Sequence, residues 1–130
     1  MNVKLNELSH TTIVEIYIKT SEYLTENDIK FIRFKSMQAC YTENYITMYG
    51  LQVRPFISYN TLVGVELKND NDDNIFIEFR KYSTTTSKQV TQFCNHYNLF
   101  KLSLNDEHLE NMIEWDIPYK KIKTLTRFNV

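Results

Sequence analysis

The side chains best suited to chemistry gather around five consecutive hydroxyl residues, Ser83 to Ser87. Arg80 and Lys81 come just before them, and Lys88 follows. The start of a helix presents unpaired backbone N–H groups and a positive dipole end, which together favour anions. One hydroxyl is enough to cap a helix, so five exceed what capping needs. The pattern predicts a surface that contacts an anion or a partner, made of Arg80, Lys81, Thr84, Thr85, Ser87 and Lys88. A purely structural role for the hydroxyls is the alternative.

A second candidate is the acidic segment that contains Asp70, Asp72 and Asp73. Carboxylate oxygens are calcium ligands, but the EF-hand loop needs a glycine at its sixth position and a glutamate at its twelfth. Counted from Asp70, those positions hold Ile75 and Lys81. We therefore expect a solvated turn, with a weak cation site as the alternative, and we predict no metal site and no cofactor.

The cysteines and histidines form no catalytic or metal-binding pattern. Cys40 and Cys94 are far apart in the chain, which favours two buried thiols in a reducing compartment, with a disulfide as the alternative. His96 follows Cys94 by two residues, so the two side chains diverge on a helix. His108 lies among acidic residues at helical spacing, which is typical of a solvated face. An enzyme is therefore not expected, because no nucleophile, base and metal set converges.

The stretch from Ser58 to Tyr97 must position the hydroxyl run. Two predicted strands flank a turn at residues 69–74, which contains only turn-forming residue types. Their apolar residues alternate and should face a helix layer: Val63, Val65, Leu67, Ile75, Ile77 and Phe79. The charged residues between them, Glu66, Glu78 and Arg80, should then lie on the outer face.

A helix is predicted directly after the hydroxyl run. Val90, Phe93, Cys94 and Tyr97 recur at the spacing of one helical face. Thr86 with Gln89 three residues later has the pattern of a capping box.

The other elements are less regular. Residues 11–20 alternate and are rich in β-branched side chains, which favours a strand. Residues 25–41 are interpreted as a helix capped by Thr25, with a strand over 29–34 as the alternative. Residues 45–59 suggest a strand that is broken near Gly50 and Pro55. A further helix is predicted over 105–115, followed by a basic tail that forms a last strand or a docked extension.

Three tyrosines recur four residues apart: Tyr41, Tyr45 and Tyr49. On a helix they would form a stripe, and on a strand they would share one face. Packing in the core or on the sheet is the favoured interpretation, with a base-stacking platform as the alternative.

Length and composition limit the architecture and the class of protein. The chain has 130 residues, of which 42% are apolar and 24% charged, which suits one soluble domain spanning 1–130. The net charge of −1 argues against a protein coated in positive charge but allows a local basic patch. We predict an α+β fold: an antiparallel sheet of about four or five strands with two or three helices packed on one face. No apolar run is long enough to cross a bilayer, so we expect a cytoplasmic protein without membrane contact.

Two segments resemble a small domain of uncharacterised bacteriophage proteins. The first is the Ser-Tyr-x-Thr strand that begins at Ser58, and the second is the Tyr-Ser-x-Thr-Thr-Ser-Lys segment from Tyr82 to Lys88. The chain departs from that pattern at Gln89, where a histidine is common, so any role of that histidine is lost. The resemblance covers about a third of the chain and transfers no catalytic residue. It implies a phage or mobile-element origin, and hence the cytoplasm of a host cell.

These observations lead to two expectations about function. The first is a phage- or mobile-element-encoded interaction protein that binds and inhibits a host defence or replication factor, for example as an anti-CRISPR-type inhibitor. Its partner would be a host protein or a ribonucleoprotein complex. The alternative is a nucleic-acid-binding accessory protein, which would use the hydroxyl-rich helix start and the basic tail at Lys120, Lys121, Lys123 and Arg127.

Overall fold

The computed structural model describes residues 3–27, 29–35, 39–59, 61–79 and 83–103. The helices in this part are the 3-10 turn η1 (Leu5–Glu7), α1 (His10–Glu26) and α2 (Thr84–His96). The strands are β1 (Phe31–Arg33), β2 (Ala39–Thr42), β3 (Ile46–Met48), β4 (Leu51–Ser58), β5 (Thr61–Lys68), β6 (Asn74–Glu78) and β7 (Phe100–Ser103). The helix predicted over 105–115 and the basic tail lie outside the described residues.

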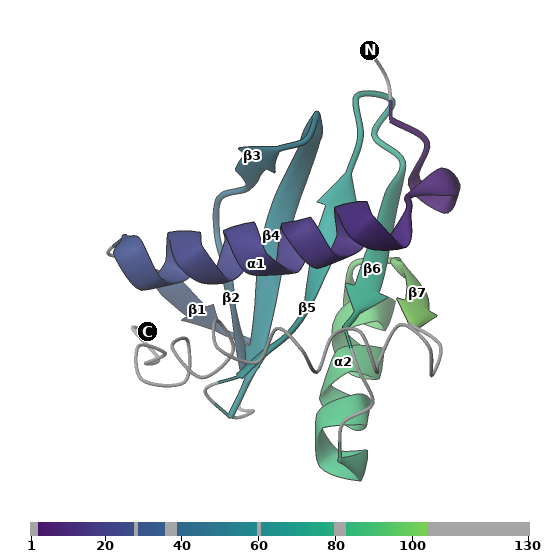
Figure 1. The fold of residues 1–130 in the computed structure, drawn as a ribbon. Helices are drawn as coiled ribbons and strands as arrows, with labels where there is room; N and C mark the ends of the chain where they lie inside the picture. The colour runs from purple at the N-terminus through teal and green to yellow at the C-terminus, as the bar shows by residue number, and fades with distance from the viewer. Residues whose placement is uncertain (1–2, 28, 36–38, 60, 80–82, 104–130) are drawn as a thin grey trace.

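The strands form one mostly antiparallel sheet in the order β1-β2-β4-β5-β6-β7, with β3 paired to β4 beside β2 (Figure 1). The pair β6–β7 is parallel, because α2 carries the chain from the end of one strand back to the start of the other. The predicted α+β class is confirmed, but the described sheet has seven strands where four or five were expected. No helix in the described ranges is both long and apolar enough to cross a membrane.

The two long helices cover opposite faces of the sheet, so the prediction that all helices share one face is wrong. Side chains of α1 pack with Val65, Leu67 and Ile77 in one core cluster. Side chains of α2 pack with Phe76, the neighbour of Ile77 along β6, in a second cluster. Successive residues of a strand point to opposite faces, so the two clusters lie on the two sides of the sheet.

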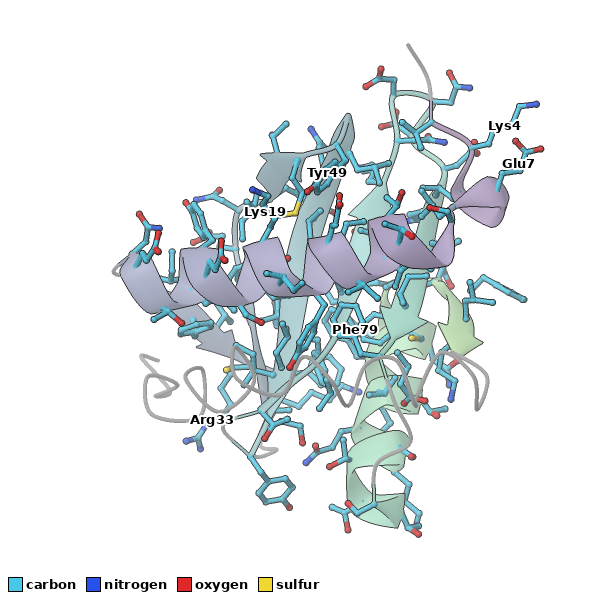
Figure 2. All side chains as sticks on the ribbon, viewed as in Figure 1. Lys4, Glu7, Lys19, Arg33, Tyr49 and Phe79 are labelled. Atoms are coloured by element: carbon cyan, nitrogen blue, oxygen red, sulfur yellow. The ribbon has the colours of Figure 1, made fainter. Side chains whose placement is uncertain are left out.

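Helix α1 replaces the strand predicted over 11–20, and that prediction is wrong. Ile13, Tyr17 and Leu24 are buried at positions i, i+4 and i+11, on the side of α1 that faces the sheet. The ring of Tyr17 meets that of Phe79, which is labelled in Figure 2, edge to face, with 4.9 Å between their centroids. The β-branched residues favoured a strand within a window of ten residues. Over the seventeen residues of α1, however, the apolar side chains recur with the period of a helix.

The helix predicted over 25–41 is also wrong. Thr25 lies in the last turn of α1 instead of starting a helix, and its hydroxyl donates to the carbonyl of Ser21 at 2.8 Å. The described residues that follow form β1 and β2, an antiparallel pair in which Phe31 opposes Thr42. This agrees with the alternative strand over 29–34, which shares Phe31–Arg33 with β1.

The predicted break near Gly50 is confirmed, whereas Pro55 lies inside β4. Tyr49 and Gly50 both have positive φ, at 52° and 72°, and link β3 to β4 as a two-residue hairpin turn. Pro55 is tolerated because the neighbour of β4 on one side changes there, from β3 opposite residues 51–53 to β2 opposite residues 56–58.

The predicted hairpin of β5 and β6 is confirmed, with Val65 opposite Ile77 and Lys68 opposite Asn74. A register shift opposite Phe56 and Ile57 turns Val63 to the α2 face, so Val63 does not share a face with Val65. The prediction that Glu66 and Glu78 lie on a solvent-exposed outer face is wrong, because both residues are buried. Arg80 lies outside the described residues.

The helix predicted after the hydroxyl run is confirmed as α2, and Val90, Phe93 and Cys94 are buried. Its cap is not the one predicted, because the hydroxyl of Ser83 accepts the N–H of Thr86 at 3.3 Å. Both cysteines are buried and free, as expected. Burial raises the pKa of the Cys40 thiol to about 12 and that of Cys94 to about 11, so both stay protonated at neutral pH.

Candidate functional site

The predicted contact surface falls on the first turns of α2. The side chains of Thr84, Thr85 and Lys88 are exposed there, and that of Ser87 is half-buried. Arg80 and Lys81, the other two residues of the prediction, lie outside the described residues. Within the described part, α2 therefore presents two hydroxyls and one ammonium group to solvent at its positive end.

Two of the five hydroxyls hold the fold together. Ser83 caps α2, and the Thr86 hydroxyl lies 3.2 Å from the hydroxyl of Ser58 at the end of β4. The Ser58 hydroxyl also bonds the side-chain carbonyl of Gln89. The structural alternative is therefore correct for Ser83 and Thr86, and it does not account for the exposed Thr84 and Thr85.

An exposed tyrosine shares this end of the molecule. Ser58 is hydrogen-bonded to Thr86 and Gln89 of α2. The next residue, Tyr59, lies in the β4–β5 turn with a φ of 49°, and it is 52% exposed. Positive φ is uncommon for a residue other than glycine or asparagine. Tyr59 is missing from the contact surface predicted from the sequence, because residues 58 and 59 were assigned to strands and no turn was predicted there. We call Tyr59, Thr84, Thr85, Ser87 and Lys88 the α2-end surface.

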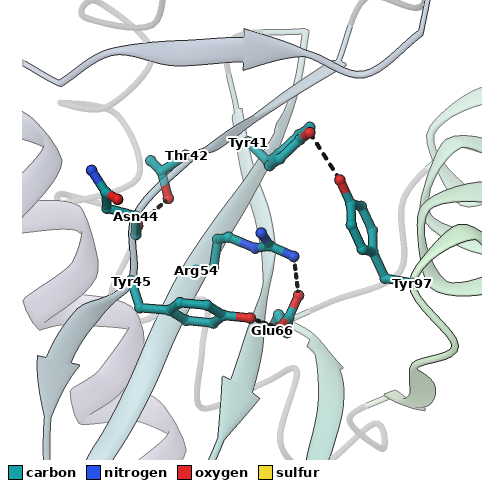
Figure 3. A network of polar contacts seen from close by, with 7 residues as sticks. All are labelled: Tyr41, Thr42, Asn44, Tyr45, Arg54, Glu66 and Tyr97. Atoms are coloured by element: carbon teal, nitrogen blue, oxygen red, sulfur yellow. Dashed lines mark hydrogen bonds and ion pairs between the residues drawn. The ribbon is translucent and has the colours of Figure 1, made fainter.

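A second cluster surrounds Arg54 on the α2 face of the sheet (Figure 3). Arg54 and Glu66 are register partners on β4 and β5, and a guanidinium nitrogen lies 2.6 Å from a Glu66 carboxylate oxygen. The hydroxyl of Tyr45 donates to the other oxygen of Glu66. The Glu66 side chain is 2% exposed and that of Arg54 11%, so this pair is shielded from water.

Three tyrosines enclose the Arg54 guanidinium. Its carbon lies 5.3 Å from the ring centroid of Tyr41, 5.0 Å from that of Tyr45 and 4.7 Å from that of Tyr97. The Tyr97 hydroxyl donates to that of Tyr41 at 2.9 Å. Tyr41 and Tyr45 thus pack on the sheet, as favoured, whereas Tyr49 lies in an exposed turn.

The chemistry of this cluster is that of a buried ion pair. Burial, reinforced by the bond to Glu66, raises the pKa of Tyr45 to about 12. Burial and the bond with Tyr41 raise that of Tyr97 to about 12. Neither phenol therefore offers an anionic base at neutral pH. Sequence reasoning missed the cluster because Glu66 was assigned to a solvent face and Arg54 was not singled out.

The raised phenol pKa values predict a loss of stability in alkali. Tyr45 and Tyr97 have a pKa near 10 in the unfolded chain and about 12 in the folded protein. Their contribution is therefore complete below pH 10 and decreases as the pH rises from 10 to 12, because only the unfolded chain releases the proton easily. Urea unfolding at steps across this window measures it. Tyr45→Phe should flatten the decrease, and a variant that keeps the full slope would contradict the assignment.

The acidic turn and His96 are explained by local structure, whereas His108 lies outside the described residues. In the acidic turn the Asn69 side-chain oxygen accepts the N–H groups of Asn71 and Asp73, both at 3.0 Å. The ring of exposed His96 packs edge to face on those of Phe34 and Tyr97. Among the described residues, no three His, Cys, Asp or Glu side chains gather closely enough to hold a metal ion.

Comparison of the chain with protein-family models, with curated proteins and with solved structures found no match, so the site rests on its own geometry.

Proposed function

We propose that this protein acts by binding a host protein, or a ribonucleoprotein complex, through the α2-end surface, and that binding inhibits a host defence or replication factor. The observation that supports this is the bonding of Ser58 to Thr86 and Gln89. It ties the β4–β5 turn to the first turn of α2, so that exposed Tyr59 and the exposed side chains of Thr84, Thr85 and Lys88 belong to one end of the fold.

The composition of this surface suits a protein partner. Tyrosine is enriched in interfaces, where it buries a large rigid ring and keeps a hydroxyl for hydrogen bonding. Thr84 and Thr85 supply short side chains that lose little entropy on binding. The surface lies on a helix and a tight turn that the core already holds in place, so little ordering is needed when a partner binds.

The inhibitory role and the phage or mobile-element origin rest on the resemblance of the Ser58 and Tyr82–Lys88 segments to bacteriophage proteins. An anti-CRISPR-type inhibitor is one form that such a protein takes. It would act in the cytoplasm of the host cell, without contact to a membrane. Catalysis has no part in this proposal.

Capture from host lysate with matched variants tests the proposal. A host factor should co-purify stoichiometrically with the wild type, and Tyr59→Ala combined with Lys88→Glu should reduce its recovery at least tenfold, in the range of an interface hot spot. Lys19→Glu makes the same charge change on the exposed side of α1 and should leave recovery unchanged. Equal recovery with all three proteins, or none with any, would refute the proposed surface.

Nucleic-acid binding is the second candidate, favoured by the anion-attracting start of α2 beside Lys88. A gel-shift titration separates the two functions, because phosphate binding must weaken steeply as salt rises. A shift at low salt that Lys88→Glu abolishes would support this candidate. The absence of a shift at low salt would eliminate it.

A further inference from the structure

A cavity of about 300 Å³ opens between the end of α1 and the connection from β2 to β3. Its apolar walls are Tyr23 of α1, Ile29 ahead of β1, and Tyr45 with Ile46 at the start of β3. Ligand pockets are about 300 to 1,000 Å³ in volume and combine aromatic walls with a few polar groups. This cavity is at the small end of that range and suits a molecule the size of one amino acid.

Two side chains of opposite charge border this cavity. Phe31 opposes Thr42 in the β1–β2 ladder, so Lys30 and Glu43 follow as the next residues at the same end of both strands. Both line the cavity, yet neither forms an ion pair with any other residue in the described part of the chain. Both residues are exposed, so the protein offers an ammonium group and a carboxylate to solvent at one opening.

The end of α1 adds negative potential to the same opening. The last turn of α1 holds no basic residue, so no cation of that turn offsets the partial negative charge of the helix end, although the Tyr23 carbonyl already accepts the backbone and side-chain N–H groups of Asn27. Tyr23, three residues before the end of α1, presents an aromatic ring to the cavity. A ring face and a helix C-terminus both favour a cation, and Glu43 adds a full charge.

Two residues that line the cavity, Thr42 and Tyr45, are held in place before any ligand binds. Tyr45 is fixed by its bond to Glu66 and by the Arg54 guanidinium against its ring. The Thr42 hydroxyl donates to the Asn44 carbonyl at 3.0 Å, which shapes the connection (Figure 3). The Asn44 side chain also lines the cavity and makes no hydrogen bond to another described residue, so its amide is open to a ligand.

We propose that this cavity binds a small zwitterion of the α-amino-acid class. The ligand ammonium lies at Glu43 and the end of α1, the ligand carboxylate at Lys30, and the Asn44 amide adds a hydrogen bond. A molecule with both charges compensates both side chains at once, whereas a neutral sugar compensates neither. The site is independent of the α2-end surface and of the function proposed for it.

Calorimetric titration of the full chain with the proteinogenic L-amino acids, one at a time, tests the proposal. At least one should bind, and Lys30→Met and Glu43→Gln should each weaken it about tenfold, the usual value of one charge-assisted bond. Lys19→Met and Glu22→Gln make the same changes on exposed positions of α1 outside the cavity and should leave the affinity unchanged.

Neutral monosaccharides and simple amines or carboxylates form the comparison set. The proposal requires that the amino acid binds more tightly than its decarboxylated amine and its deaminated acid. It would be overturned if no amino acid binds, if a neutral sugar binds instead, or if the cavity variants and the α1 controls have equal affinity. Thermal melting of each variant confirms that it is folded before titration.

Discussion

Replacing Gly64 by alanine should destabilise the protein by about 3 kcal/mol, at the upper end of the range for overpacking a core. A Cβ atom at this position would lie 2.5 Å from Cε1 and Cζ of the Phe76 ring, and in overlap with the carbonyl oxygen of Ile77. Neither neighbour can move aside easily. The carbonyl belongs to β6, and the Phe76 ring is fully buried against Phe56 and Phe93.

Urea unfolding measures this effect, and Gly50→Ala is the matched control. A Cβ atom at Gly50 would lie 3.3 Å from Cγ2 of Val3, which is tight but not an overlap. The cost there comes mainly from the positive φ of 72° and should be about 1 kcal/mol. Equal losses in the two variants would show that backbone conformation, and not the contact with Phe76, decides the effect at Gly64.

The second large effect concerns the buried ion pair. Glu66→Ala should destabilise the fold by about 3–5 kcal/mol, because it leaves the Arg54 guanidinium shielded from water without its counter-charge. The loss of the Tyr45 hydrogen bond adds to this cost. Arg54→Ala leaves Glu66 in the same position and should be similarly damaging.

A double replacement separates the value of the ion pair from the cost of breaking it. Arg54→Met with Glu66→Leu removes both charges and keeps apolar volume, so it should be much less destabilising than either single alanine variant. Urea unfolding of the wild type, Arg54→Met, Glu66→Leu and the double variant forms a double-mutant cycle. A double variant as unstable as Glu66→Ala would show that the polar bonds to the surrounding tyrosines, and not the unpaired charge, dominate the loss.

The parts of the fold that were predicted correctly are those in which local pattern and tertiary packing agree. The β5–β6 hairpin has alternating apolar residues on both sides of a turn made of turn formers, and α2 has a clear apolar face. The strand predicted over 11–20 failed because β-branched content in a short window outweighed the longer period, which Leu24 completes. The ladder from Phe31 to Arg33 is too short for periodicity to distinguish it from a helix.

Within the candidate site, the sequence predicted the exposed residues at the start of α2 but not the residues that pair across strands. Thr84, Thr85 and Lys88 are exposed, whereas Thr86 and Gln89 of the same helix are buried against Ser58. Thr86 was predicted to cap α2, but Ser83 is the cap. A run of hydroxyl residues offers several possible caps, and the packing of the inward side of α2 decides which of them is used. Arg54 and Glu66 pair across two strands whose register depends on the whole sheet, so no local pattern identifies them.

Because α2 lies between β6 and β7 in the chain, we expect the strands of this sheet to detach from it at different rates. Short turns join β4 to β5 and β5 to β6, so each of these strands can pair as soon as its neighbour has formed. β7 can pair with β6 only after the whole of α2 has closed the loop between them, and among the described strands it lies at the edge of the sheet. The amide protons of β7 should therefore exchange with solvent when β7 alone detaches from the sheet. Those of β5 should exchange more slowly, because their exchange requires the whole sheet to open.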